Sequence, residues 1–332
     1  MPNVFNNVKL DPPRMIPSLV EGFNTVASNV YLILFPIILD IFLWLGPRLR
    51  VKQFFLPLVL EASELSSSAY GVEAVDFIET SRQIWTSLLD QLNLFYGLRT
   101  FPVGIPSLLV SYFVEKNPIG TPLSIEVASG RLIMLWISAL LLVGLMLGSL
   151  YYALVARAAI DQRTLDWSML INQSAQVMIL SLILLVALAL LMVPVSCLLS
   201  SLLVMIPSLG SLPFLILGLV LVWVLLPLVF SPHGIFAGEL KATRSIVTSF
   251  RFVRSMMAGT GMFFIMLIII GYGLDILWTT PRADSWLLLV GIFGHAFISS
   301  GLLAASFKYY DHGIKWQQEI LQAHQNNQST TA

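Results

Sequence analysis

The fold of this chain is decided by one stretch, residues 213–257, which reads PFLILGLVLVWVLLPLVFSPHGIFAGELKATRSIVTSFRFVRSMM. Its first part, up to about Phe230, is uncharged and long enough to cross a bilayer. Its second part is amphipathic and basic, and the chain then becomes apolar again. A span, a basic helix at the lipid headgroups and a second span together indicate an integral membrane protein.

The basic part of this stretch predicts an interfacial helix over residues 236–257. At helical spacing, one face carries polar and basic side chains, which are Lys241, Arg244, Thr248, Arg251 and Ser255. The other face is apolar and comprises Ile246, Phe250, Val253 and Met257. We predict that Lys241, Arg244, Arg251 and Arg254 contact anionic lipid headgroups, each contributing about 1 kcal/mol. The simpler interpretation is a solvated topology signal, and the two are compatible.

Composition supports the membrane class. Hydrophobic residues make up 57% of the chain and charged residues only 11%, against about 25% charged in soluble domains. The formal net charge is zero, so no basic excess points to nucleic acid. Cys197 is the only cysteine, which excludes an intrachain disulfide and a thiolate metal cluster within one chain. Nothing in the sequence calls for a cofactor.

The hydropathy pattern predicts an all-α polytopic bundle with about six transmembrane helices. The predicted spans cover residues 29–46, 131–156, 176–199, 213–231, 258–278 and 285–307. An amphipathic helix lies within the N-terminal residues 1–28, and residues 308–332 form a polar tail. Residues 47–130 are predicted to form a helical extracytoplasmic cap. Within it, the run that begins at Phe101 is too short to span and is broken by prolines, which predicts an interfacial or re-entrant segment.

The second span contains Gly144 and Gly148 in a GxxxG spacing. Small residues one turn apart let another backbone approach closely. We expect this motif to serve packing within the chain, with a dimer contact as the alternative.

Basic residues predict the orientation. With six spans, the side that holds both termini carries ten lysines and arginines, whereas the two short links on the other side carry only Arg282. This asymmetry places both termini in the cytoplasm. Arg48, Arg50 and Lys52 oppose it, but they begin a long segment with seven basic and eight acidic residues, and long segments follow the rule poorly.

Three features together resemble known bacterial membrane families. They are the amphipathic helix before the first span, the segment from Ala242 to Arg254 with its small, basic, serine and phenylalanine residues, and a last span that ends in KYYD at Lys308–Asp311. They are similar to the YciC-like proteins and to the membrane domain attached to some glycerophosphodiester phosphodiesterases, mainly over residues 213–311. The resemblance implies a six-helix bundle in the bacterial inner membrane. It does not imply phosphodiesterase activity, because the soluble catalytic domain of those enzymes has no counterpart here.

Asp40, Asp275 and His295 are the ionisable residues that we predict at membrane depth. An ionised aspartate at a helix centre costs about 2.5–3.5 kcal/mol on insertion scales, so such residues are functional candidates by default. The structural alternative pairs the acids with Arg48, Arg50 or Arg282, or bonds them to backbone near the interface. For His295 the alternative is a neutral ring bonded to a hydroxyl or carbonyl. On the structural interpretation the three residues need not meet.

Sequence motifs do not indicate an enzyme. The chain has no HExxH or GxSxG motif, and its four histidines lack metal-ligand spacing. The leading hypothesis is therefore a non-catalytic membrane scaffold or accessory subunit in envelope or lipid handling, with lipids and a membrane protein partner as its contacts. The alternative is a transporter or channel-like protein that uses Asp40, Asp275 and His295. An intramembrane enzyme is the weakest hypothesis.

Overall fold

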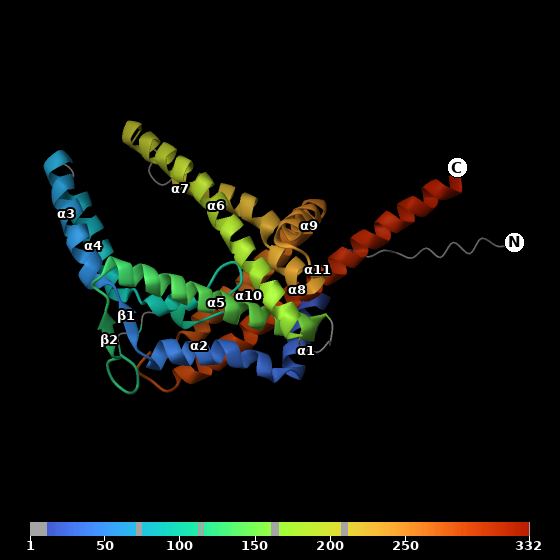
Figure 1. The fold of residues 1–332 in the computed structure, drawn as a ribbon, viewed down its shortest axis with the longest axis horizontal. Helices are drawn as coiled ribbons and strands as arrows, with labels where there is room; N and C mark the ends of the chain where they lie inside the picture. The colour runs from blue at the N-terminus through green and yellow to red at the C-terminus, as the bar shows by residue number, and fades with distance from the viewer. Residues whose placement is uncertain are drawn as a thin grey trace. The chain divides into compact units, whose positions relative to one another are not determined.

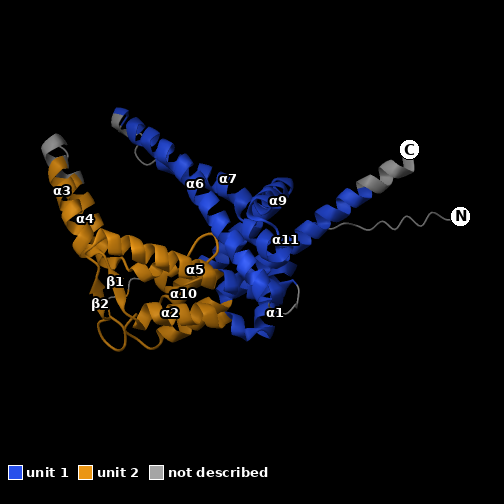
Figure 2. Cartoon of the chain, viewed as in Figure 1, with its two compact units in different colours: residues 1–32, 149–272, 298–332 blue, residues 33–148, 273–297 orange. Residues whose placement is uncertain are grey.

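A computed structural model describes residues 12–70, 75–111, 114, 116–160, 166–206 and 212–331 (Figure 1). Of residues 66–70, 75–77, 111, 203–204 and 324–331 it describes the backbone alone. The chain forms two compact units, coloured separately in Figure 2. Unit 1 comprises residues 1–32, 149–272 and 298–332, and unit 2 comprises residues 33–148 and 273–297.

Apolar helices dominate the described residues and confirm the all-α membrane class. Five of these helices are long and apolar enough to cross a bilayer, and a sixth span is counted if Met15–Ser28 and Val30–Leu45 act together. The five are α5 (Gly130–Ala159), α6 (Trp167–Met205), α7 with its continuation (Leu212–Gly238), α10 (Met257–Trp278) and α11 (Leu288–Thr331). The predicted count of about six agrees with this finding.

Two helices are longer than the spans that we predicted within them. Helix α6 has 39 residues where we predicted a span over 176–199, and at 1.5 Å per residue it is about 58 Å long. Helix α11 runs through the segment that we assigned to a polar tail after residue 307. The hydropathy window ends where polar residues begin, but a helix needs no apolar residues to continue once it leaves the membrane.

Unit 1 contains α1 (Met15–Ser28), α6, α7 (Leu212–Leu225), a 3₁₀ turn (Leu226–Leu228), α8 (Ser231–Gly238), α9 (Ala242–Ser255) and parts of α5, α10 and α11. Its core is aromatic. Phe230, Phe252, Phe263 and Tyr309 are all fully buried, and the Phe263 and Tyr309 rings stack with centroids 4.2 Å apart. This cluster joins α9, α10 and α11 to the residues between α7 and α8.

The fourth span is interrupted, and side chains of α9 form hydrogen bonds with the backbone groups that the interruption frees. Pro227 and Pro232 interrupt the helix and free backbone groups that would be costly in lipid. The Ser249 hydroxyl donates to the carbonyl of Pro227 at 2.7 Å and accepts from the backbone N–H of Phe230 at 3.1 Å. The Ser245 hydroxyl donates to the carbonyl of Ser231. The buried face of α9 is therefore rich in serine, because a broken helix needs hydroxyl partners.

This arrangement corrects our prediction for residues 236–257. Residues up to Gly238 belong to α8, and Glu239 takes a left-handed conformation (φ 51°) that separates it from α9. Within the predicted apolar face, Val253 is buried and Phe250 is 45% exposed.

Replacing Ser249 with alanine should destabilise unit 1. The Pro227 carbonyl and the Phe230 N–H would both lose their partner in a buried place, at about 1–3 kcal/mol for each group. The measurement is the unfolding midpoint of the purified protein in detergent. Ser255→Ala is the matched control, because Ser255 lies at the exposed end of the same helix and should shift the midpoint little. Equal midpoints for the two variants would contradict the proposed role of Ser249 in bonding these backbone groups.

Unit 2 contains α2 (Leu34–Leu45), β1 (Arg48–Arg50), α3 (Lys52–Tyr70), α4 (Val75–Gln91), 3₁₀ turns at Leu94–Leu98 and Leu109–Ser111, and β2 (Ser124–Glu126). The start of α5, the end of α10 and the start of α11 complete it. Strands β1 and β2 pair in parallel, with Leu49 opposite Ile125. We predicted a helical segment for residues 47–130, but neither the α3–α4 hairpin nor this small sheet.

The GxxxG glycines pack within the chain, as we expected, but against an irregular segment instead of a helix. A Cβ at Gly144 would lie 2.6 Å from the carbonyl oxygen of Leu98, and one at Gly148 would lie 2.9 Å from that of Val103. This segment then turns inward, since Val103, Ile105 and Leu109 are buried. The two glycines therefore allow the run after Phe101, which we predicted to be interfacial or re-entrant, to pack closely against α5.

Candidate functional site

The three predicted membrane-depth residues all belong to unit 2. Asp40 lies on α2, Asp275 near the end of α10 and His295 near the start of α11. His295 Nδ1 lies 2.7 Å from Asp275 Oδ1. His295 and Asp275 therefore meet, although the structural interpretation did not require it.

The Asp40 carboxylate is held by hydrogen bonds from a neighbouring turn. Asp40 is fully buried, and its carboxylate accepts three hydrogen bonds from the turn that begins the second 3₁₀ helix. Oδ1 accepts from the Ser107 hydroxyl at 2.5 Å and from the Leu109 N–H at 3.2 Å, and Oδ2 accepts from the Leu108 N–H at 3.1 Å. Of the structural alternatives, this matches bonding to the backbone, and it holds the run after Phe101 against α2.

The His295–Asp275 pair leaves one imidazole nitrogen without a hydrogen-bond partner among the described residues. His295 is 8% exposed, and its Nε2 has no hydrogen-bond partner among the described residues. The Asp275 side chain is 33% exposed. Asp275 does not pair with Arg282 as we considered, because Arg282 binds Asp284 at 2.8 Å. A histidine bonded to a carboxylate through one nitrogen can gain or lose a proton at the other.

Aromatic and amide side chains connect three segments of unit 2 at the end of α2. The Trp44 indole N–H donates to the carbonyl of Ala283 at 2.7 Å, and its ring meets that of Trp286 edge to face at 5.7 Å. The Asn117 amide donates to the carbonyl of Trp44 at 3.1 Å. The α10–α11 link and the loop at residue 117 are thus both fastened to the end of α2, one turn beyond Asp40.

The four predicted lipid contacts lie on or beside α9 in unit 1. Lys241 precedes the first residue of the helix, and Lys241, Arg244, Arg251 and Arg254 are all exposed. The helix has three sides: serines toward the protein, Arg244 and Arg251 on a second side, and Val247 and Phe250 on a third. Val247 and Phe250 are 46% and 45% exposed. A helix with a basic side next to an exposed apolar side suits the lipid–water boundary.

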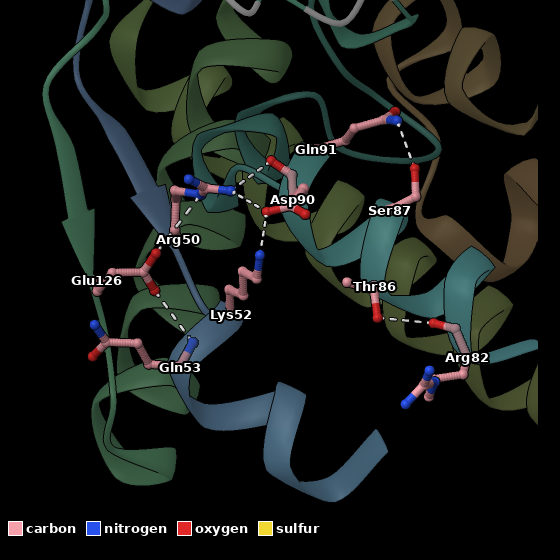
Figure 3. Close-up of polar contacts among 9 residues, drawn as sticks. All are labelled: Arg50, Lys52, Gln53, Arg82, Thr86, Ser87, Asp90, Gln91 and Glu126. Carbon is pink, nitrogen blue, oxygen red and sulfur yellow. Dashed lines mark hydrogen bonds and ion pairs between the residues drawn. The ribbon is translucent and has the colours of Figure 1, made fainter. Parts of the chain in front are cut away.

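A second candidate site is the groove between α3 and α4, whose polar contacts are drawn in Figure 3. The groove has a volume of about 590 Å³ and an apolar wall made by Leu56 and Leu60 of α3. The opposite wall is polar and belongs to α4, with Gln83, Thr86, Ser87 and Gln91 among its residues.

Ion pairs fasten the base of this hairpin to the small sheet (Figure 3). Asp90 accepts from Arg50 at 3.0 Å and from Lys52 at 2.7 Å, and Arg50 also faces Glu126 at 3.7 Å. Further along α4, a hydrogen bond from Arg82 lowers the pKa of the Glu79 carboxyl. The charged residues that line the groove, Arg82 and Asp90, are thus already paired within the chain.

Our sequence reasoning missed His233, a second buried histidine. It lies on α8 at 5% exposure, with Nε2 2.8 Å from the Ser306 hydroxyl and its ring centroid 4.3 Å from that of Phe307. The proline-rich break before it was the available signal, because a broken span exposes side chains that must find partners inside the bundle. Across the part of the chain that is described, no three His, Cys, Asp or Glu residues are grouped to hold a metal ion.

No protein-family model, curated protein or solved structure matches this chain.

Proposed function

We propose that the protein is a non-catalytic scaffold or accessory subunit of a membrane complex in envelope or lipid handling. The observation that carries this proposal is the α3–α4 hairpin, which lies outside the candidate spans and turns apolar side chains outward. On α4, Ile84, Trp85 and Leu88 are 54%, 54% and 49% exposed, and their spacing places them on one side of the helix. Contiguous apolar surface outside a membrane is typical of contact sites for other molecules.

The spans of unit 1 support the same proposal. In α6 only 17% of the most apolar window is buried within the chain, and in α10 only 11%. Lipid tails or helices of another protein therefore surround most of their surface. An accessory subunit requires such outward-facing helices together with a rigid extramembrane module.

The proposal places the protein in the bacterial inner membrane, with both termini in the cytoplasm and the hairpin outside. Anionic headgroups contact Lys241, Arg244, Arg251 and Arg254, while Phe250 enters the acyl boundary. The resemblance to the YciC-like families remains a prediction that supports this location.

Cysteine labelling from outside the cell tests the orientation. Asn117 and Ser245 are poor labelling positions because both are buried, so we choose exposed positions on α4 and α11. In a Cys197→Ser background, an impermeant maleimide should label a cysteine at Gln83 and should reach one at Gln318 only after permeabilisation. The reverse pattern would invert the topology.

The scaffold role is tested by isolating the protein from native membranes in mild detergent and measuring its mass by native mass spectrometry. We expect a stable hetero-complex with lipids retained, and one or more further polypeptides in fixed stoichiometry. A protein that is recovered only as a free chain after cross-linking in intact cells would contradict the proposal.

The His295–Asp275 pair favours transport as a second candidate function. A buried imidazole whose one nitrogen lies against a carboxylate and whose other nitrogen has no partner among the described residues is an arrangement that can carry a proton. In proteoliposomes with an internal pH dye, a proton carrier would lose its flux on His295→Gln, since glutamine cannot titrate. Equal flux in wild type, His295→Gln and empty vesicles would remove this candidate.

A further inference from the structure

We infer that the groove between α3 and α4 binds an amphipathic, basic helix of a partner protein. This inference rests on the proposed scaffold function and names the chemistry of the partner. It is argued from the lining of the groove, from the charge of the hairpin and from the way the hairpin is held.

The lining fits a helix with two different sides. Leu56 and Leu60 are one turn apart on α3 and form an apolar wall. On α4, Gln83, Thr86 and Ser87 present amide and hydroxyl groups across the groove. A third helix in this position would place apolar residues against α3 and polar residues against α4. Lipid tails would use only the apolar wall, so the polar wall favours protein.

The net charge of the hairpin indicates the charge of the partner helix. Between Lys52 and Leu92 the sequence has six acidic and two basic residues, a formal net charge of −4. The partner helix therefore carries lysines and arginines, and opposite charges also speed association.

The base of the hairpin makes the groove a fixed surface. Asp90 is held by Arg50, the last residue of strand β1, and by Lys52, the first residue of α3 (Figure 3). The side chain of Asn93, just beyond α4, accepts from the backbone N–H of Leu49 at 3.0 Å. A groove that is pre-formed loses less conformational entropy when its ligand binds.

The test uses a phage-displayed library of random 16-residue peptides and the full chain in phosphatidylcholine nanodiscs. The library is selected on the wild-type protein and counter-selected on Leu60→Arg, which places a positive charge in the groove at a side chain that is 38% exposed. Leu58→Arg is the matched control, because Leu58 is on the same helix and exposed but does not line the groove.

We expect the selected peptides to combine apolar residues at helical spacing with lysine or arginine residues. Leu60→Arg should weaken their binding at least tenfold, and Leu58→Arg less than twofold. The inference is overturned if no peptide prefers wild type over Leu60→Arg, if the selected peptides are neutral or acidic, or if they bind equally to empty nanodiscs. A hetero-complex that forms in native membranes despite such a result would leave the scaffold role standing and remove only the groove.

Discussion

Asp40→Ala should destabilise the protein more than any other single removal of a charged side chain in unit 2. Three donors lose their acceptor in a buried place: the Ser107 hydroxyl and the backbone N–H groups of Leu108 and Leu109. An unpaired buried group costs about 1–3 kcal/mol, and loss of the buried carboxylate returns part of that total. We expect a net loss of at least about 2 kcal/mol on this scale, measured as a lower unfolding midpoint in detergent.

Asp284→Ala is the matched control for this prediction. Asp284 also carries an ion pair, to Arg282, but that pair is exposed and should contribute about 1 kcal/mol or less. Asp40→Asn adds a second comparison, because asparagine keeps one acceptor oxygen and should fall between wild type and Asp40→Ala. If Asp40→Ala unfolds at the same midpoint as Asp284→Ala, the carboxylate does not hold the run after Phe101.

Loosening of the turn should also become visible locally. The backbone amides of Leu108 and Leu109 should exchange hydrogen faster in Asp40→Ala than in wild type, since their acceptor is gone. The amides of β1 and β2, which pair with each other elsewhere in unit 2, should exchange as before. Faster exchange throughout the unit would indicate global destabilisation instead of local loosening of this turn.

The class of the fold could be predicted from sequence because hydropathy adds up along the chain. A run of apolar residues reports a span whatever its neighbours are, and the predicted α10 boundaries, 258–278, differ from those of the structure by one residue. The amphipathic helix before the first span, the packing role of Gly144 and Gly148 and the short irregular run after Phe101 were accessible for the same local reasons.

What could not be predicted depends on contacts between distant segments. The acceptor role of Asp40 is invisible until Ser107 is seen beside it, and the approach of His295 to Asp275 follows from a helical hairpin whose rotation hydropathy does not report. The inward position of Ser245 and Ser249 on α9 was missed for a related reason. A helical wheel treats apolar residues as the inward side, whereas the carbonyls freed by Pro227 and Pro232 required hydroxyl groups there.

Gly291→Ala should have an effect of comparable size near the candidate site. Gly291 lies at the start of α11, and a Cβ at this position would overlap the carbonyl oxygen of Trp278, the last residue of α10. One turn along, a Cβ at Gly294 would lie 2.8 Å from the Trp278 ring. The obstacle at Gly291 is backbone, which a rotamer change cannot relieve, so we expect the upper part of the range of about 1–3 kcal/mol for overpacking.

Gly273→Ala provides the opposite expectation on the neighbouring helix. A Cβ at Gly273 meets no atom within 4 Å, and alanine is a better helix former than glycine by about 1 kcal/mol. Gly273→Ala should therefore leave the unfolding midpoint unchanged or raise it, while Gly291→Ala lowers it. Because Asp275 and His295 lie on the two helices that Gly291 holds together, Gly291→Ala should also lengthen the His295 Nδ1–Asp275 hydrogen bond. The imidazole ¹⁵N shifts of His295 measure that change, and unchanged shifts together with an unchanged midpoint would show that the helices tolerate a methyl group between them.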